Sequence, residues 1–264
     1  MVRQYSLQQS RRALFDAYAS IVVASRHMAE EYARYVSEAK LRVVPLPIEL
    51  DRPVPARRSR AGAWRLLYLG RLEKSKGAAV ALEAAARAAE KLQRPVHLQV
   101  SGAGTLHEVL AARAVELMRV QPLLQVTFTG WLDRHLVTAA LDQSDLLLVP
   151  SRWPEPFGMV GVEAALRGVP SIAFGVGGIP EWLVDGVSGR LVPEGPRAIE
   201  RFGDAVADCL RDDASLARMR DLGRANAARF SMAAHIASLE PVLAEAAGAP
   251  KAARTVEDAV ELLV

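Results

Sequence analysis

A loop with two basic side chains between two glycines is the first place where this sequence suggests chemistry. The segment from Gly70 to Gly77 directly follows an apolar run. Gly70 allows a sharp exit from a strand, and Gly77 permits a tight turn into a helix. The guanidinium of Arg71 can bind a phosphate through two hydrogen bonds, and the ammonium of Lys76 adds a point charge. The spacing predicts that Arg71 and Lys76 bind one anion; the alternative is a solvated basic loop.

A second loop, Ser151–Gly158, lies between an apolar run and a predicted helix from Met159 to Arg167. The N-terminus of a helix presents free backbone N–H groups and is therefore a ready anion site. Glu155 in the loop and Glu163 in the helix are separated by seven residues. A carboxylate in a largely apolar helix needs partners, and sugar hydroxyl groups are suitable ones; a buried ion pair is the alternative. The amides expected to face a ligand are those of Gly158, Met159 and Val160.

Glycine-rich segments follow further apolar runs. Gly175–Glu181 and Gly186–Gly189 are turn signals. Ser101–Gly104 follows another predicted strand, where glycine allows a backbone to approach a ligand closely. This last segment lacks the third glycine of a dinucleotide-binding motif, which argues against a Rossmann dehydrogenase.

The elements that must position these loops are short apolar runs rather than alternating ones, which is typical of parallel strands buried on both faces. The predicted strands are Ser20–Ala24, Leu41–Leu46, Arg65–Leu69, Val96–Val100, Gln125–Thr129, Leu146–Val149, Pro170–Phe174 and Arg190–Val192. Helical patterns lie between them, among them the alanine-rich segment Ala78–Lys91. The alternation from Trp64 to Ala228 predicts a doubly wound α/β domain with a parallel, Rossmann-like sheet. Such sheets bind ligands beyond the carboxyl ends of their strands.

The ends of the chain differ from this domain. Residues 1–50 show two predicted strands and two predicted helices, Ser6–Tyr18 and Arg26–Tyr35. Two strands do not make a sheet with two buried faces, so we interpret residues 1–50 as the end of a second α/β domain whose larger part is absent. Alternatively, these strands join the edge of the main sheet. Residues 51–62 are a proline-containing linker, 63–230 the main domain and 231–264 a helical tail, in which Thr255 can cap a short helix with one apolar stripe.

Composition limits the class of protein. The 264 residues are 51% hydrophobic and 24% charged, with a net charge of +3, which is typical of a globular protein. We interpret the basic cluster Arg57–Arg60 as part of a solvated linker; contact with an anionic membrane is the alternative. Without accompanying aromatic residues it does not predict nucleic-acid binding. No run approaches the ~18 apolar residues of a membrane span, and Met1–Arg12 lacks the apolar core of a signal peptide. Cys209 is the only cysteine, which excludes an intrachain disulfide. We expect a cytoplasmic protein.

Four motifs together resemble the nucleotide-binding half of the retaining glycosyltransferases of family 4, which have the GT-B fold. They are Gly70–Gly77, Glu155 to Glu163, Gly177–Glu181 and Gly186–Gly189. They occur in the order and with the spacing of that family, and the resemblance covers about Ser20 to Ser231.

The resemblance implies a role for each matched position. Arg71 and Lys76 would hold the diphosphate of a nucleotide-sugar such as a UDP- or GDP-sugar, beside Gly70. Glu155 would contact the donor sugar, and Glu163 the ribose hydroxyls. The backbone of Phe157, Gly158, Met159 and Val160 would contact sugar and phosphate, while Gly102, Gly104, Trp131 and Leu132 would border the base. The family needs no divalent metal and no cofactor, and it transfers the sugar with retention to a carbohydrate or lipid-linked acceptor.

The chain departs from the family in having little of the first domain, which would supply the acceptor-binding groups. We therefore expect the donor-binding part of a transferase, with the missing N-terminal domain as a required partner. Two alternatives stay open: a nucleotide-sugar binding module without turnover, and a non-hydrolysing sugar-nucleotide epimerase. The paired glutamates argue against the epimerase.

Overall fold

The computed structural model describes residues 15–50, 52–54 and 62–248. The chain divides into two compact units. The central unit is Ile48–Arg229, and the terminal unit combines Met1–Pro47 with Phe230–Val264. The domain limits expected from the sequence stay a prediction.

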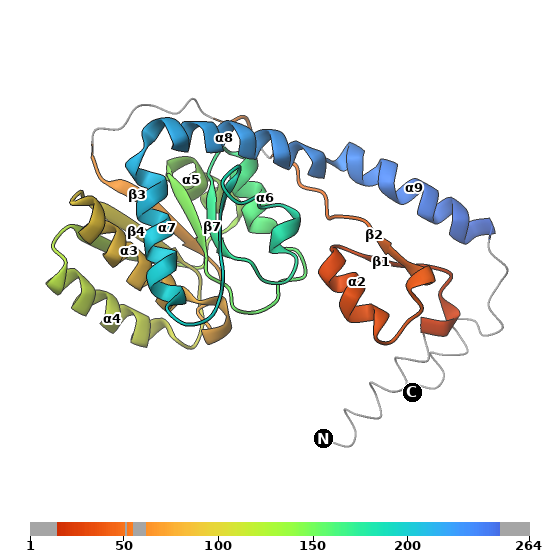
Figure 1. Ribbon diagram of the computed structural model, residues 1–264, viewed down its shortest axis with the longest axis horizontal. Helices are drawn as coiled ribbons and strands as arrows, with labels where there is room; N and C mark the ends of the chain where they lie inside the picture. Colours follow the sequence, from red (N-terminus) through yellow and green to blue (C-terminus); the bar gives the residue numbers. More distant parts are fainter. Residues whose placement is uncertain (1–14, 51, 55–61, 249–264) are drawn as a thin grey trace, which may run out of the picture. The chain divides into compact units, whose positions relative to one another are not determined.

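The central unit is built on a six-stranded parallel sheet in the order β5-β4-β3-β6-β7-β8 (Figure 1). The strands are β3 (Trp64–Leu69), β4 (Val96–Ser101), β5 (Leu124–Gly130), β6 (Leu146–Val149), β7 (Ser171–Phe174) and β8 (Gly189–Val192). All four residues of β6 are buried, as are all four of β7. This explains why the apolar runs in the sequence are continuous, since strands in the middle of such a sheet meet helices on both faces.

The strand order reverses at one place. From β3 the chain moves outward through β4 to β5, and it then returns to β6 on the other side of β3. Because crossover connections are right-handed, the helices that connect β3, β4 and β5 lie on one face of the sheet, and the helices directly before and after β6 lie on the other. The carboxyl ends of β3 and β6 therefore flank a topological switch point, where open parallel sheets bind ligands.

Helices cover both faces of the sheet. They are α3 (Ala78–Leu92), α4 (His107–Val120), α5 (Arg134–Gln143), α6 (Met159–Leu166), α7 (Ala198–Arg211) and α8 (Asp213–Ala227). Helix α3 packs against α4 and α7, and α6 packs against α8. The side of α3 that faces the core consists mostly of alanine, so that α3 and α7 approach closely. The short 3-10 segments are η2 (Lys74–Lys76), η3 (Ile179–Glu181) and η4 (Ala228–Phe230).

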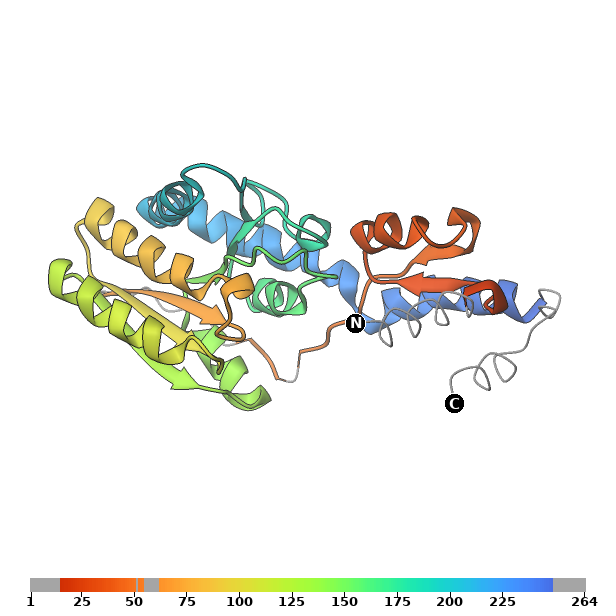
Figure 2. The same ribbon diagram turned by 90° about the horizontal axis from the view of Figure 1, so that it is seen from below.

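The terminal unit has its own small sheet. Strands β1 (Ile21–Val23) and β2 (Leu41–Val43) pair in parallel, with Ile21 opposite Leu41. Helix α2 (Arg26–Ala33), the 3-10 segment η1 (Glu38–Lys40) and α9 (Met232–Gly248) complete it, and Figure 2 shows α2 and α9 on opposite sides of the two strands. Because β1 and β2 form a separate sheet, the alternative that they join the edge of the main sheet is wrong.

Hydrogen bonds connect α9 to the strand segment of its own unit. Arg42 donates to both carboxylate oxygens of Glu245, at 2.8 and 3.0 Å, and a ring nitrogen of His235 lies 2.8 Å from the carbonyl oxygen of Pro45. Much of the helix expected at Ser6–Tyr18, and the stripe that begins near Thr255, lie outside the described residues.

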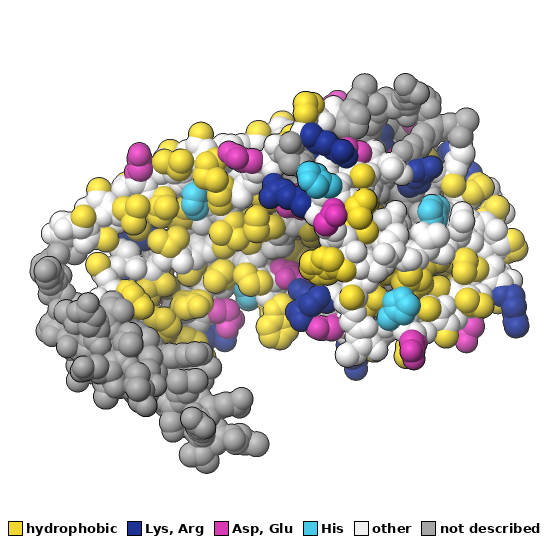
Figure 3. All heavy atoms as spheres, turned by 180° about the vertical axis from the view of Figure 1, so that it is seen from behind, with side chains coloured by type: hydrophobic (Ala, Val, Ile, Leu, Met, Phe, Trp, Pro, Cys, Tyr) yellow, Lys and Arg dark blue, Asp and Glu magenta, His cyan; other side chains and the backbone are white. Residues whose placement is uncertain are grey.

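The terminal unit leaves apolar side chains at its surface. The exposed ones include Tyr18, Val22, Tyr35, Val43, Leu46, Met232, Ile236 and Leu243, and hydrophobic side chains gather over this unit in Figure 3. Within the described ranges, none of the helices is long and apolar enough to cross a membrane.

Candidate functional site

The loop after β3 and the loop after β6 meet at the switch point. The backbone N–H groups of Arg152 and Trp153 both donate to the carbonyl oxygen of Ser75, over 2.8 and 3.2 Å. Gly77 ends the first loop with φ +73°, and a Cβ at this position would lie 1.9 Å from the carbonyl oxygen of Pro150. Only glycine fits there, so this residue sets both the turn into α3 and the close approach of the two loops.

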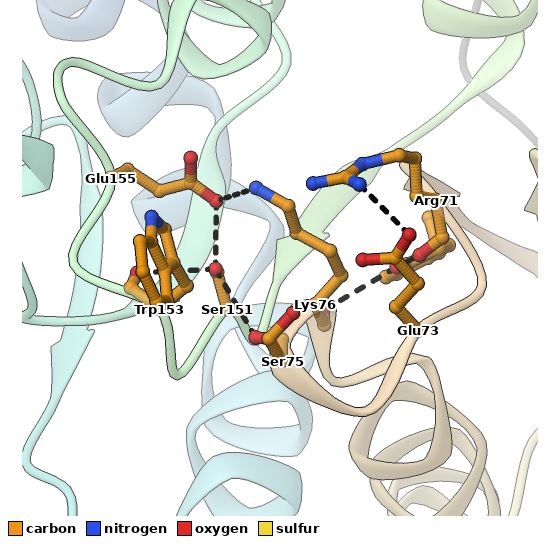
Figure 4. Close-up of polar contacts among 8 residues, drawn as sticks. Arg71, Glu73, Ser75, Lys76, Ser151, Trp153 and Glu155 are labelled. Atoms are coloured by element: carbon orange, nitrogen blue, oxygen red, sulfur yellow. Dashed lines mark hydrogen bonds and ion pairs between the residues drawn. The ribbon is translucent and has the colours of Figure 1, made fainter. Parts of the chain in front are cut away.

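An ion pair connects the two loops. Nζ of Lys76 lies 2.5 Å from Oε1 of Glu155, and their side chains are only 19% and 16% exposed. The hydroxyl of Ser151 donates to the same carboxylate oxygen at 2.7 Å. Figure 4 shows these three side chains converging from the two loops. Lys76 and Glu155, expected to act on one ligand, are thus in direct contact.

Arg71 lies at the same edge of the sheet. Its guanidinium is paired with Glu73 at 2.8 Å and its side chain is 61% exposed. In Figure 4 the guanidinium of Arg71 extends toward the ammonium of Lys76. Each cation therefore has a carboxylate partner, and their joint action on one anion stays a prediction.

Tyr68, which we did not predict as a site residue, fixes the backbone of the first loop. It is buried on β3, and its hydroxyl donates to the carbonyl oxygen of Arg71 at 2.9 Å. Burial raises the pKa of the Tyr68 hydroxyl above its ordinary value, and the carboxylates of Glu155 and Glu73 raise it further. The group therefore remains a neutral donor. A tyrosine in a mostly apolar, buried strand was the available signal, since its hydroxyl needs a partner.

The third glycine-rich segment fixes the loop that carries Glu155. The backbone N–H of Gly178 donates to the carbonyl oxygen of Glu155 at 2.7 Å. A Cβ on Gly177 would lie 2.4 Å from the backbone nitrogen of Glu155. The indole N–H of Trp182, a buried residue that follows η3, donates to the carbonyl oxygen of Phe157 at 2.6 Å. Gly178 and Trp182 thus fix the backbone of the loop that carries Glu155.

The N-terminus of α6 opens directly after this loop. Gly158 has φ +86°, and no side chain caps the helix. The first amides of a helix have no partner inside it, and the helix dipole makes this end attractive to anions. Because the side chain of Phe157 is buried, this residue can contribute only its backbone to a ligand. Met159 and Val160 form the first turn.

Other predicted residues lie within α6 and after β5. Glu163 lines a cavity of about 30 Å³ together with Ile48, Glu49, Leu50, Arg134, Val137, Thr138, Leu141 and Arg167. A cavity of this size holds a few water molecules at most. Trp131 is 76% exposed after β5, and Leu132 beside it is half-buried.

Gly102 and Gly104 pack against the first loop. Their positions leave no room for a side chain, since a Cβ would lie 1.9 Å from the carbonyl oxygen of Gly70 and 2.5 Å from that of Leu72. These two glycines therefore have a packing role beside Gly70. That they border the base of a bound nucleotide stays a prediction. In the described part of the chain, no three His, Cys, Asp or Glu side chains are grouped so that they could hold a metal ion.

Comparison with known proteins identifies the family. The family model for "Glycosyl transferases group 1" matches residues 55–226. The chain belongs to this family. Among the curated relatives, a glycogen synthase of Mycobacterium tuberculosis is 34% identical over 214 residues, which is 80% of this chain and 49% of that protein. A D-inositol 3-phosphate glycosyltransferase of Corynebacterium diphtheriae is 32% identical over 184 residues, covering 69% of this chain and 42% of that protein.

Solved structures of glycosyltransferases share the fold of this group 1 glycosyl transferase. The pneumococcal O-GlcNAc transferase GtfA, solved in complex with UDP and GlcNAc, superposes with a TM-score of 0.71 at 18% identity, over 88% of this chain and 46% of that one. The expected doubly wound α/β fold and the resemblance to the GT-B glycosyltransferases are confirmed. The chain spans about half the length of the curated relatives it matches.

Proposed function

We propose that this group 1 glycosyl transferase binds a nucleoside-diphosphate sugar at the switch point and forms the donor-binding part of a retaining, metal-independent transferase. The observation that carries the proposal is the contact between Lys76 and Glu155, which lie just before α3 and α6. A cation, a carboxylate and the first backbone amides of α6 thus follow the carboxyl ends of two adjacent strands. A diphosphate, a sugar hydroxyl and a sugar phosphate are suitable ligands for these three groups.

The chemistry follows from the charges. Breaking the bond between the anomeric carbon and the diphosphate develops negative charge on the leaving group. Lys76, Arg71 and the amides of Gly158–Val160 would stabilise that charge, which is the electrostatic task that a metal ion performs elsewhere. Glu155 would accept a hydrogen bond from a hydroxyl of the donor sugar, and Glu163 from the ribose. Trp131 and Leu132 would border the base.

The charges of the site are paired within the protein. Arg71 is paired with Glu73, and Lys76 with Glu155. An incoming diphosphate competes with Glu155 for Lys76, so that binding would release this carboxylate toward the sugar. The pair would thereby couple occupancy of the diphosphate position to the orientation of Glu155.

The donor nucleotide is proposed to be UDP or GDP, and the acceptor a carbohydrate or a lipid-linked sugar. Support for UDP comes from the complex of GtfA. Support for a transferase rather than an epimerase comes from the family match. Because the chain spans about half of its relatives, a binding module without turnover is the second candidate.

A thermal-shift panel of UDP, GDP, ADP and CMP with their sugars tests the proposal. A ligand at a hundred times its dissociation constant adds about 2.7 kcal/mol to the free energy of unfolding. We expect one nucleoside diphosphate and its sugar ester to raise the melting temperature, also in the presence of EDTA. The absence of any shift across the panel would refute donor binding, and a shift that EDTA removes would refute metal independence.

A further inference from the structure

The four tryptophans fall into two groups. Trp64 and Trp182 are 8% and 2% exposed and belong to the core. Trp131 and Trp153 are 76% and 57% exposed, and they follow the carboxyl ends of β5 and β6. An indole exposes a large apolar area to water, which is unfavourable unless a ligand or partner covers it. Trp131 already has a predicted role at the base, whereas Trp153 has none.

The backbone around Trp153 is fixed although its ring is exposed. Its N–H donates to the carbonyl oxygen of Ser75 at 3.2 Å, and the N–H of Arg152 donates to the same oxygen at 2.8 Å. The side chain of Arg152 pairs with Glu194 at 3.2 Å. A ligand that stacks on Trp153 would therefore meet a loop held in place on both sides, which limits the entropy lost on binding.

Trp153 lies in the same loop as the carboxylate of the proposed sugar position. Trp153 precedes Glu155 by two residues in the same loop. Figure 4 shows the indole next to Glu155, on the side of the Lys76–Glu155 ion pair that is away from Arg71. In this view the groups follow one another as guanidinium, ammonium, carboxylate and aromatic ring. The first two suit a diphosphate, and the last two suit a sugar.

We propose that Trp153 is a stacking surface for a pyranose ring and selects sugars that present a face of C–H groups. The inference rests on the proposed function. A pyranose has hydroxyl groups at its rim and, in many sugars, a face made of C–H groups. Glu155 would accept from a rim hydroxyl, while the negative face of the indole attracts the slightly positive C–H groups. The ring in question is the donor sugar, because the acceptor is expected to be held by the facing domain.

Paired titrations with a nucleoside diphosphate and its sugar ester test the role of Trp153. The ligands are UDP with UDP-glucose and GDP with GDP-mannose, whichever pair the wild-type chain binds, and the variants are Trp153→Ala and Trp153→Phe. If the donor sugar stacks on the indole, Trp153→Ala weakens the sugar ester about 3- to 10-fold and leaves the diphosphate within about 2-fold. Trp153→Phe keeps an aromatic face and retains most of the affinity.

Trp131→Ala is the matched control, since it removes the other exposed indole. Because Trp131 is predicted to border the base, Trp131→Ala should weaken the binding of the diphosphate and of the sugar ester by similar factors.

The inference is overturned if Trp153→Ala weakens the diphosphate and its sugar ester equally, or changes the affinity for neither ligand. It is also overturned if Trp153→Ala only lowers the melting temperature, since the indole would then serve protein packing. Each of these results leaves the proposed function standing, because the wild-type chain binds the diphosphate. A wild-type chain that binds no nucleoside diphosphate contradicts the proposed function itself, and the role of Trp153 with it.

Discussion

Lys76 and Glu155 show how a single contact can keep two site residues ready for a ligand. Both side chains are mostly buried, and desolvating an ion costs several kcal/mol. The short contact between them and the hydrogen bond from Ser151 offset that cost. In the proposed function a diphosphate replaces Glu155 as the partner of Lys76, while Glu155 keeps the hydrogen bond from Ser151 and gains one from a sugar hydroxyl.

Tyr68 gives the first prediction, because its hydroxyl holds the backbone of Arg71. We expect Tyr68→Phe to lower the free energy of unfolding by about 1 kcal/mol and to weaken nucleoside-diphosphate binding several-fold, since the loop with both cations loses a support. Chemical denaturation and calorimetric titration measure the two effects. Tyr35→Phe, at an exposed position, is the control. An unchanged diphosphate affinity would show that Tyr68 does not position the loop.

Glu163 gives the second prediction, because its proposed ligand is the ribose. Glu163→Ala should weaken a nucleoside and a nucleoside diphosphate by similar factors and leave inorganic pyrophosphate binding unchanged. Competition titrations with the three ligands measure this. Glu108→Ala, on the exposed side of α4, controls for the loss of one negative charge. If folded Glu163→Ala binds the nucleotide with wild-type affinity, the assignment to the ribose is wrong.

Among the elements, α3 and α7 are joined by a charged cluster as well as by alanines. Asp204 on α7 accepts from Arg87 at 2.6 Å and lies 2.5 Å from Nζ of Lys91, both on α3. The hydrogen bond from Arg87 is the main cause that lowers the pKa of Asp204 from 3.8 to about 2, and Lys91 adds to it. Because the folded pKa lies below the unfolded one, the cluster stabilises the fold above pH 4 and loses this effect as the pH falls toward 2.

Replacing Asp204 therefore has a pH-dependent effect. We expect Asp204→Asn to lower the free energy of unfolding by about 1 kcal/mol at pH 7, a value reduced for the partial exposure of the cluster. The difference from wild type should shrink below pH 4. Urea denaturation at several pH values measures it, with Asp208→Asn, an exposed position on the same helix, as control. A difference that stays constant down to pH 3 would exclude the ion pairs as its cause.

The elements could be predicted from the sequence more fully than the contacts between their loops. The run Leu146–Val149 is β6 with the same bounds, and Ala78–Lys91 is α3 with one residue added, because burial on both faces and alanine content leave clear local patterns. The hydrogen bonds from Arg152 and Trp153 to Ser75, and the support of Glu155 by Gly178, join residues far apart in the chain. No local pattern encodes these partners, so they required the structure.

At the scale of the whole molecule, the chain spans 49% of a glycogen synthase to which it is 34% identical. The described residues of the terminal unit contain one two-stranded sheet, and an isolated pair of strands is marginally stable on its own. We propose that sugar transfer needs further strands of an α/β domain that faces the donor site, since such a domain would hold the acceptor.

This proposal predicts that the 264-residue chain binds the donor but transfers its sugar slowly. Positioning an acceptor beside the anomeric carbon contributes up to ~7–11 kcal/mol in favourable systems. Single-turnover transfer by this chain is compared with that by a version extended at its N-terminus with a complete facing domain. Equal rates would contradict the prediction and mean that the chain is sufficient for catalysis.

The central claim is that Lys76 and Arg71 hold a diphosphate, and the most direct test compares a nucleoside diphosphate with its nucleoside by calorimetric titration. Each charge-assisted hydrogen bond contributes about 1.5–3 kcal/mol. Lys76→Ala and Arg71→Ala should each weaken the diphosphate at least about tenfold and the nucleoside less than about twofold. Lys74→Ala, an exposed lysine in the same 3-10 segment η2, should change neither. Equal losses for diphosphate and nucleoside, or no loss in either variant, would contradict the claim.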